Sequence, residues 1–332
     1  MKIITIDTTS GIPKYKQIVL SIEIAIAENR LKKNDKLPSV NKISLEFSLS
    51  RDTVLLAYDE LKKRGIIYAI LGKGYYVKSV EFSFEQRIFL LFDELNSFKE
   101  DIYNSFLETM NNSAQVDIFF HHFNIDMFRK LINEANGNYS KYIIMPTNLI
   151  GAPALIKTLP NQDVYILDQT NSDLKDYPSI YQNFVKDIYK AMLKGKYLID
   201  KYQKLILLFP GFREPVGMKI GFEKFCADFD IKNEVINGFE DREIQKGAVY
   251  IIPNDRDLVR VIEKAKLQHL KLGTDFGIIS YNETPLKKVV ENGITTISTD
   301  FIEMGKILAQ MILSGKKEQI ENKSELIIRK SL

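Results

Sequence analysis

The stretch LPSVNKISLEFSLSRDTVLLAYDELKKRGIIYAILGKGYYV, residues 37–77, decides the fold of the first part of this chain. Pro38 ends any preceding helix, and Ser39 and Ser50 are each well placed to cap the start of a new one. Two short helices separated by a tight turn are therefore predicted. Two β-rich runs follow, joined by the tetrapeptide LGKG, whose glycines allow a tight hairpin turn. This order of elements predicts a winged helix-turn-helix.

The polar residues of this stretch are of the types that contact DNA. The first residues of a recognition helix can reach base edges in the major groove, where an arginine can bond guanine or grip a phosphate. A basic hairpin tip between glycines suits the minor groove or a phosphate. The predicted DNA contacts are Ser39, Lys42, Ser50, Arg51, Asp52, Thr53, Gly72, Lys73 and Gly74. Singly, each also fits a helix cap, a solvated charge or an ordinary turn, but their order favours DNA.

Length and charge agree with a small basic head on a larger body. A chain of 332 residues suggests about two domains, and a hydrophobic content of 45% is enough for real cores. Residues 1–79 hold 14 Lys and Arg against 8 Asp and Glu, whereas the remainder holds 32 against 35. This contrast favours a local contact between the head and a polyanion.

Targeting signals and disulfides are not expected. The N-terminus MKIITIDTTSGIPKY lacks the apolar core of a signal peptide, and no apolar run approaches the roughly 20 residues of a membrane span. The single cysteine, Cys226, excludes an intramolecular disulfide and reads as a small buried helix residue. The sequence therefore predicts a soluble, cytoplasmic protein without a membrane partner.

The segments PKYKQI, LPSVNKIS, LSRDTVLLAYDELKKRGII and GKGYYV together resemble the DNA-binding domain of the GntR family, over about residues 10–78. The resemblance implies that Ser39, Arg51, Thr53 and the wing at 72–74 occupy DNA-contacting positions. The chain departs from many family members at Asn41, where they carry an arginine. Asparagine can still read adenine or bond a phosphate, so Asn41 joins the predicted DNA contacts, but the usual operator cannot be assumed.

After a short linker at residues 80–86, the body at 87–332 alternates apolar strands with amphipathic helices. The predicted strands are RIFLLFDEL, VDIFFHH, KYIIMP, DVYILD, KLILLFP, AVYIIPN and FGIISYN. Strands that alternate with helices argue for parallel sheets covered on both faces. The predicted fold class is therefore α/β for the body, preceded by a winged helix-turn-helix at residues 1–79.

Polar side chains follow the ends of these strands. In open α/β sheets, ligands bind beyond the carboxyl ends of the strands. Planar polar groups that bond hydroxyl pairs, beside aromatic rings that stack on an apolar face, would make a sugar site. The predicted ligand contacts are Asp93, Asn96, His122, Asp168, Arg213, Asn254, Asp255 and Asn282. The competing interpretation is that strand-end loops are polar in any α/β protein.

The segments PVGMKIGFEKF, YIIPNDRDLV and FGIISYNETP, with ENGITTISTDFIEMGKILAQMIL, resemble the effector domain of the LacI/GalR family, which is built like a type I periplasmic sugar-binding protein. The resemblance implies two lobes joined by three crossings near residues 179–182, 296–298 and 318–324, with the ligand between the lobes. It also implies that Asp255 contacts the sugar. The sugar-binding arginine of that family is replaced here by Met218, and Arg213 is the predicted substitute.

A head and body of these two kinds together resemble the arabinose-repressor-like regulators. That resemblance implies a transcriptional repressor without enzymatic activity or cofactor, which acts as a homodimer on a pseudo-palindromic operator in double-stranded DNA. It also implies a monosaccharide effector. A pentose or deoxyhexose is the guess, because arabinose and fucose regulators share this architecture. The sugar is expected to close the cleft and release the DNA.

Other chemistries find less support in the sequence. Adjacent histidines on a strand would point to opposite faces, so His121 and His122 are not expected to share a metal ion, and no metal site is predicted. The sequence contains no G-x-x-x-x-G-K-[ST] phosphate loop. The alternatives are a regulator that responds to a non-sugar ligand, a DNA binder without an effector, a plain solute-binding protein and a pyridoxal-phosphate-dependent protein.

Overall fold

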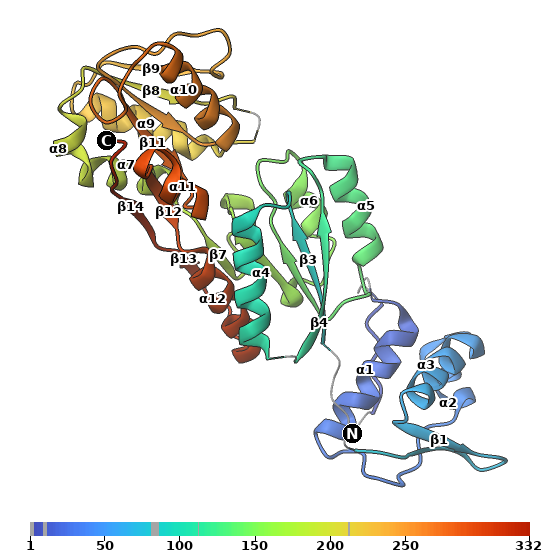
Figure 1. Ribbon diagram of the computed structural model, residues 1–332. Coiled ribbons are helices and arrows are strands. Elements are labelled where there is room, and N and C mark those ends of the chain that lie inside the picture. Colours follow the sequence, from blue (N-terminus) through green and yellow to red (C-terminus); the bar gives the residue numbers. More distant parts are fainter. Residues whose placement is uncertain (1–2, 9–11, 81–85, 112, 212) are drawn as a thin grey trace.

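The computed structural model describes residues 3–8, 12–80, 86–111, 113–211 and 213–332. Figure 1 shows a small head, with three helices and a hairpin, beside one lobe of a larger two-lobed body. The elements of the head are α1 (Lys14–Ala27), α2 (Val40–Phe47), α3 (Arg51–Lys63), β1 (Ile67–Ile70) and β2 (Gly74–Val77). The predicted order of a winged helix-turn-helix is therefore present.

One hydrophobic core holds the head together. Ile18, Ile22 and Ala25 of α1 are completely buried, and they share this core with Val54 and Leu61 of α3. Apolar residues spaced by three or four positions give each helix one apolar stripe, and the stripes face one another.

Six strands of the described residues form the first lobe, in the order β13-β7-β6-β5-β3-β4, and all of them are parallel. Its elements are β3 (Gln86–Phe92), α4 (Ser97–Met110), β4 (Ala114–Phe120), α5 (Ile125–Ala135), β5 (Lys141–Ile144), α6 (Ala152–Ile156), η1 (Asn161–Asp163), β6 (Val164–Asp168), η2 (Ser172–Leu174), β7 (Ser179–Tyr181), α12 (Phe301–Ser314) and β13 (Gln319–Glu321). Helices α4 and α12 pack on one face of the sheet, and α5 and α6 pack on the other. Burial on both faces explains why β5 and β6 are almost continuously apolar.

The second lobe repeats this plan with the strand order β14-β12-β11-β10-β8-β9, in which only the edge strand β14 is antiparallel among the described strands. Its elements are α7 (Phe184–Lys194), α8 (Lys196–Ile199), β8 (Lys204–Leu208), α9 (Val216–Asp228), β9 (Asn233–Ile236), β10 (Ala248–Ile252), α10 (Asp255–Leu267), β11 (Gly277–Tyr281), α11 (Pro285–Val289), η3 (Val290–Asn292), β12 (Thr295–Thr299) and β14 (Ser324–Ile327). Helices α7 and α9 cover one face, and α10 covers the other. In the described part of the chain, no helix is both long and apolar enough to cross a membrane.

The chain passes between the two lobes three times within the described residues. The first passage, at 182–183, follows β7; the second, at Asp300, follows β12; and the third, at 322–323, joins β13 to β14. The first and third lie at the predicted crossings or next to them. The second comes just after the predicted one, because Thr296–Ser298 still belong to β12. Each lobe is therefore assembled from two separate parts of the chain.

Each lobe contains one pair of helices packed so closely that a glycine is required at the contact. In the first lobe α12 lies against α4, and a Cβ atom at Gly305 would overlap the carbonyl oxygen of Ile102. In the second lobe α9 lies against α7, and a Cβ atom at Gly221 would overlap the carbonyl oxygen of Val185. Both overlaps involve backbone atoms, which cannot move aside as the end of a flexible side chain can.

The predicted fold class is confirmed, but some element boundaries differ from the predicted ones. Strand β3 begins at Gln86, which the sequence placed in the linker, while residues 81–85 of that linker lie outside the described residues. Strand β4 ends at Phe120, so the prediction that His121 and His122 lie on it was wrong. Both histidines belong to the turn after the strand, where His122 has a φ of 50°.

Candidate DNA-binding surface and ligand cleft

The first turn of α3 carries the predicted recognition residues. The Ser50 hydroxyl caps the helix by accepting a hydrogen bond from the Thr53 backbone N–H at 3.2 Å, and the two hydroxyl oxygens lie 2.8 Å apart. Arg51 and Asp52 are exposed, whereas Thr53 is half-buried. Because the capping bonds engage Ser50 and Thr53, Arg51 is the side chain of this turn best suited to reach a base.

The start of α2 presents a second set of predicted contacts. The Ser39 hydroxyl caps this helix by accepting from the Lys42 backbone N–H at 3.2 Å, and Ser39, Asn41 and Lys42 are all exposed. The buried Tyr58 hydroxyl of α3 donates to the Pro38 carbonyl oxygen at 2.6 Å. This bond connects the start of α2 to α3 and helps to fix the position of the two helices, and of their polar first turns, relative to each other.

The wing is an antiparallel hairpin with a short tip. Strand β1 pairs with β2 so that Ile67 lies opposite Val77 and Ile70 lies opposite Gly74, which leaves residues 71–73 as the connecting loop. Gly72 and Gly74 have φ angles of 73° and 108°, in the region that favours glycine. The tip therefore holds the exposed Lys73 between two residues whose conformation the turn requires.

In the first lobe, several predicted ligand residues serve local structure. The buried Asp93 carboxylate lies 3.2 Å from the buried Lys99 ammonium, and the Asn96 side chain caps α4 by accepting from the Lys99 backbone N–H at 3.1 Å. His122 is exposed, whereas its neighbour His121 is buried, and burial lowers the pKa of His121. Among these predicted ligand residues, the exposed His122 is the one that neither caps a helix nor forms an ion pair within the described part of the chain.

Asp168 connects the end of β6 to the passages between the lobes. Its side chain is buried, and burial raises its pKa even though the nearby Lys99 opposes the shift. The Gln182 side-chain amide donates to the Asp168 carboxylate and accepts from the Thr299 hydroxyl at 2.6 Å. Gln182 lies in the first passage and Thr299 immediately precedes the second. A ligand that bonds Asp168 would therefore contact a group tied to the hinge.

In the second lobe, the buried Lys287 organises the end of β11. Its Nζ donates to the carbonyl oxygens of Tyr281 at 2.6 Å and Asn282 at 2.9 Å, and it lies 2.9 Å from an Asp255 carboxylate oxygen. The side chain of Lys287 is 4% exposed, whereas that of Asp255 is 59% exposed. Burial lowers the pKa of Lys287, while Asp255 favours the charged form. Lys287 thus holds Asp255 at the edge of the sheet with one face still open to solvent.

The two predicted asparagines of this lobe differ in whether their side chains are free to bind a ligand. Asn254 caps α10 by accepting from the Asp257 backbone N–H at 2.8 Å, and its amide donates to the Asp257 carboxylate at 2.9 Å. The side-chain oxygen of Asn282 is buried and has no hydrogen-bond partner within the described part of the chain. A buried polar atom without a partner costs free energy, so Asn282 is the better candidate to receive a ligand hydroxyl.

Loops of the two lobes meet at Arg213, which follows β8. Its guanidinium lies 2.9 Å from a Glu94 carboxylate oxygen and 5.0 Å from the centre of the Phe123 ring, both in the first lobe. The Asn148 amide of the first lobe also donates to the Glu214 carbonyl oxygen at 3.2 Å. Arg213 therefore lies at the interface between the lobes. Because its side chain is 55% exposed, this ion pair contributes at most about 1 kcal/mol.

Beside the hinge, α7 buries an unpaired carboxyl oxygen. Asp187 is 8% exposed, and its Oδ2 has no hydrogen-bond partner among the described residues; the buried Tyr281 hydroxyl nearby has none either. Across the third passage, Glu321 accepts from the Asn183 amide at 3.1 Å and pairs with Lys186. Burial, and next the Glu321 carboxylate, raises the pKa of Asp187 to about 7.

The raised pKa of Asp187 predicts a pH-dependent stability. The folded state retains this proton up to about pH 7, whereas the unfolded chain releases it near pH 4, so the stabilisation is lost as the pH rises through 7. Asp187→Asn, which mimics the protonated form, is expected to raise the free energy of unfolding at pH 8 by about 2–4 kcal/mol and to change it little at pH 4. Urea unfolding at both pH values measures this. The exposed Asp200→Asn is the control, and an equal response of both variants would contradict the assignment.

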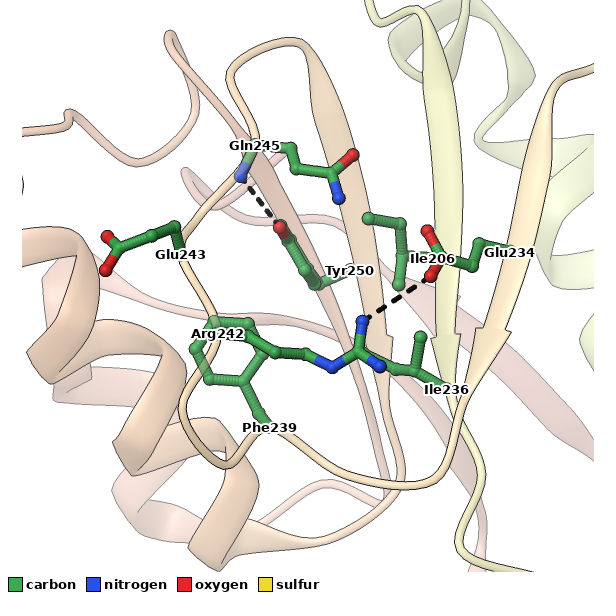
Figure 2. Close-up of a pocket in the computed structure, with 8 residues that line it drawn as sticks. All are labelled: Ile206, Glu234, Ile236, Phe239, Arg242, Glu243, Gln245 and Tyr250. Atoms are coloured by element: carbon green, nitrogen blue, oxygen red, sulfur yellow. Dashed lines mark hydrogen bonds and ion pairs between the residues drawn. The ribbon is translucent and has the colours of Figure 1, made fainter.

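Figure 2 shows a pocket in the second lobe, lined by residues of β8, β9, β10 and the loop between β9 and β10. Its volume is about 240 Å³, and none of its described lining residues is a predicted ligand contact. Its floor is apolar, and the loop at 237–247, which connects β9 to β10 without a helix, covers it. Its charged lining groups are already paired: Arg242 lies 3.5 Å from Glu234, and Glu243 lies 2.6 Å from Lys264. The pocket reflects incomplete covering of the sheet by a short connection.

A second hollow, of about 420 Å³, lies where β8 and β9 end. It is lined by Pro210, Asn237, Gly238, Glu240, Arg242, Asp257 and Arg260. Arg260 lies 3.2 Å from both Glu240 and Asp257, so its charge is balanced within the hollow. None of the predicted ligand residues lines this hollow within the described part of the chain.

Sequence analysis missed three features of the site. Lys287 reads as half of a Lys-Lys pair on a helix, and nothing in its spacing signals burial. Gln182 is the last residue of the predicted first crossing at 179–182, and this position could have identified it. Strand β9 (Asn233–Ile236) was not predicted because two of its four residues are polar, so Asn237 at its end was not considered.

Comparisons with known proteins match the two parts of the chain separately. Residues 14–77 match the model of the bacterial regulatory proteins of the gntR family, and residues 212–332 match that of the periplasmic binding protein-like domain. The arabinose metabolism transcriptional repressor of Geobacillus stearothermophilus is 39% identical over 66 residues, which are 20% of this chain and 18% of that protein. The mannosyl-D-glycerate transport/metabolism system repressor MngR of Escherichia coli is 35% identical over 97 residues, 29% of this chain and 38% of that protein. The chain thus spans well under two thirds of the length of these curated relatives.

Solved structures extend the likeness to the body. A dimeric Lac repressor with an 11-residue C-terminal deletion superposes with a TM-score of 0.63 and 16% identity, covering 74% of this chain and 98% of that chain. At this level of identity the likeness concerns the fold, and it agrees with the two parallel sheets described above.

Proposed function

We propose that this chain, in which a GntR-family helix-turn-helix precedes a two-lobed periplasmic-binding-protein-like domain, is a transcriptional repressor whose affinity for operator DNA is controlled by a monosaccharide. The observation that carries the proposal is that one chain combines a recognition helix whose first turn is exposed with a body of two lobes joined by three passages. It acts in the cytoplasm as a homodimer, with two heads on a pseudo-palindromic operator about one helical turn apart.

In this proposal the head contacts DNA with three elements. The start of α3, with Arg51 and Asp52 exposed, enters the major groove, while Ser39, Asn41 and Lys42 at the start of α2 approach the backbone. The wing, with Gly72, Lys73 and Gly74, contacts the neighbouring minor groove or its phosphates. The excess of basic over acidic residues in the head supports its binding to the negatively charged DNA backbone.

The sugar binds between the lobes and contacts Asp168, Arg213, Asp255 and Asn282, each of which lies at or shortly after the end of a strand. Its hydroxyl groups bond Asp168 and the unpartnered Asn282 oxygen, and the Phe123 ring beside Arg213 offers an apolar face. The predicted set also includes Asp93, Asn96, His122 and Asn254. Asp93 pairs with Lys99, and Asn96 and Asn254 cap helices, so His122 is the member of this group that is most available to a ligand. The name of the arabinose repressor among the relatives supports a pentose.

A sugar bound to Asp168 affects the hinge through two hydrogen bonds, one between Asp168 and Gln182 and one between Gln182 and Thr299. The head touches the first lobe, since the Lys16 ammonium of α1 lies 2.8 Å from the Asn138 side-chain oxygen, so a movement of that lobe reaches the head. The sugar must bind the two states unequally to switch them. A coupling of about 1–3 kcal/mol changes operator affinity roughly 5- to 150-fold, and we expect release.

A panel of monosaccharides and their phosphates tests the effector. At 100 times its dissociation constant a ligand adds about 2.7 kcal/mol to stability, and each kcal/mol raises the melting temperature of a domain this size by roughly 2–4 °C. One sugar is expected to raise the melting temperature and to release a duplex that the protein selects from a random library. A rise caused only by a non-sugar compound would refute the sugar effector, and selection of no duplex would refute the repressor.

A further inference from the structure

The tip of the wing exposes a large apolar side chain. Leu71 is 102% exposed, and the preceding Ile70 is 36% exposed. Lys73, two positions further on, closes the turn by donating its backbone N–H to the Ile70 carbonyl oxygen at 3.0 Å. Single exposed leucines are ordinary on protein surfaces, but this one stands at the most protruding point of a hairpin that the proposed function turns towards DNA.

The strands below Leu71 are tied together, while the tip itself stands in open space. A Cβ atom at Gly72 would meet nothing within 4 Å. Below the tip, the rings of Tyr68 and Tyr76 lie 5.8 Å apart, and Lys36 forms an additional β-bridge with Tyr76. These contacts support the base of the hairpin and leave the Leu71 side chain fully exposed at its tip.

An apolar side chain at a projecting tip can contact apolar surface of DNA in the minor groove. The deoxyribose walls of the minor groove and the faces of partly unstacked bases are apolar, and proteins that bend DNA insert leucine or similar residues there. A cation close to such a wedge, as Lys73 is, can bind the adjacent phosphates. The alternative major-groove partner, a thymine methyl group, belongs to the recognition helix rather than to a projecting tip.

We infer that Leu71 enters the minor groove and wedges against a base step, so that the wing bends the operator and selects for deformable sequence. The inference rests on the proposed function and adds to it a form of specificity that needs no base hydrogen bond. Pyrimidine–purine steps unstack most easily, so such a step is expected at the wing contact.

The experiment compares the wild type with Leu71→Ala and Leu71→Gln on a duplex that the wild type selects from a random library. The duplex carries 2-aminopurine at successive positions of the flank, because this base brightens when it unstacks. The wild type is expected to brighten one flanking position and to bend the duplex, as measured by energy transfer between its ends. Both variants are expected to lose these signals and to bind roughly 5- to 30-fold more weakly.

Two controls separate the wedge from simple charge and surface effects. Leu267→Ala removes a leucine that is 76% exposed on α10 of the body, and it should leave DNA binding unchanged. Lys73→Ala should reduce the salt dependence of binding by about one phosphate contact per subunit, or about two per dimer, whereas Leu71→Ala should not. Equal affinity and equal 2-aminopurine signals for wild type and Leu71→Ala would overturn this inference alone. Failure to select any duplex would overturn the proposed function and the wedge with it.

Discussion

Arg51→Ala is expected to weaken binding of the selected operator duplex by roughly 30- to 10,000-fold. A bidentate contact between arginine and guanine contributes about 1–3 kcal/mol, and a dimer loses two such contacts. Arg51 is exposed in the first turn of α3, where the capping bonds of Ser50 and Thr53 leave it as the base-reading candidate. Fluorescence anisotropy at a fixed salt concentration measures the loss.

Two further variants make this prediction specific. Arg129→Ala removes the same charge from α5 of the body, where Arg129 is 51% exposed, and it should not change operator affinity. Arg51→Lys keeps the charge but loses the two-pronged geometry, so it should retain non-specific binding and lose discrimination between sequences. If Arg51→Ala binds the selected duplex as tightly as the wild type, α3 does not read the operator through this residue.

Lys287→Met is expected to lower the free energy of unfolding by about 3–5 kcal/mol. The change leaves the carbonyl oxygens of Tyr281 and Asn282 without their donor and leaves Asp255 without its partner. The loss is costly because the carbonyl oxygen of Tyr281 stays buried and that of Asn282 partly buried without a donor, whereas the exposed Asp255 carboxylate remains hydrated. The melting temperature should fall by roughly 6–20 °C, which calorimetry measures.

The neighbouring Lys288 provides the matched control. It is exposed on the same short helix, so Lys288→Met should change stability by less than about 0.5 kcal/mol. Asp255→Asn should fall between the two, because the carboxylate of Asp255 is more than half exposed. A Lys287→Met protein as stable as wild type would show that the three contacts of Lys287 do not support the strand end.

The sequence predicted the head well because its signals are local. A serine that caps a helix and a glycine that permits a tight turn are each recognised from a few neighbouring residues. The structure confirms both serine caps and the hairpin, in which Gly72 has a φ of 73°. The alternation of strands and helices in the body is similarly local, and it predicted the α/β class with parallel sheets, whereas the two lobes were predicted only from the resemblance to the LacI/GalR effector domain. The DNA contacts themselves stay predictions.

The surroundings of the candidate ligand residues were harder to predict because they depend on contacts between residues far apart in the sequence. A strand-end position identified Asp168 and Asp255, but not the hydrogen bond from Gln182 or the ion pair with Lys287. The sequence also could not show that Asp93 is paired with Lys99 inside the first lobe. Lys99 and Lys287 both lie on helices in otherwise polar surroundings, and burial of a lysine is decided by the packing of other elements around it.

The three passages between the lobes also bear on how a ribosome makes this protein. The first lobe includes α12 and β13, and the second includes β14, which are the last elements of the chain. Neither lobe can therefore complete its fold until almost the whole body has been synthesised. At about 5–20 residues per second, the apolar face of α4 would wait roughly 10–40 s for its partner helix. The head is one continuous stretch and can fold at once. A nascent chain would therefore carry a finished head on an unfinished body, and we expect chaperones to be needed during that interval.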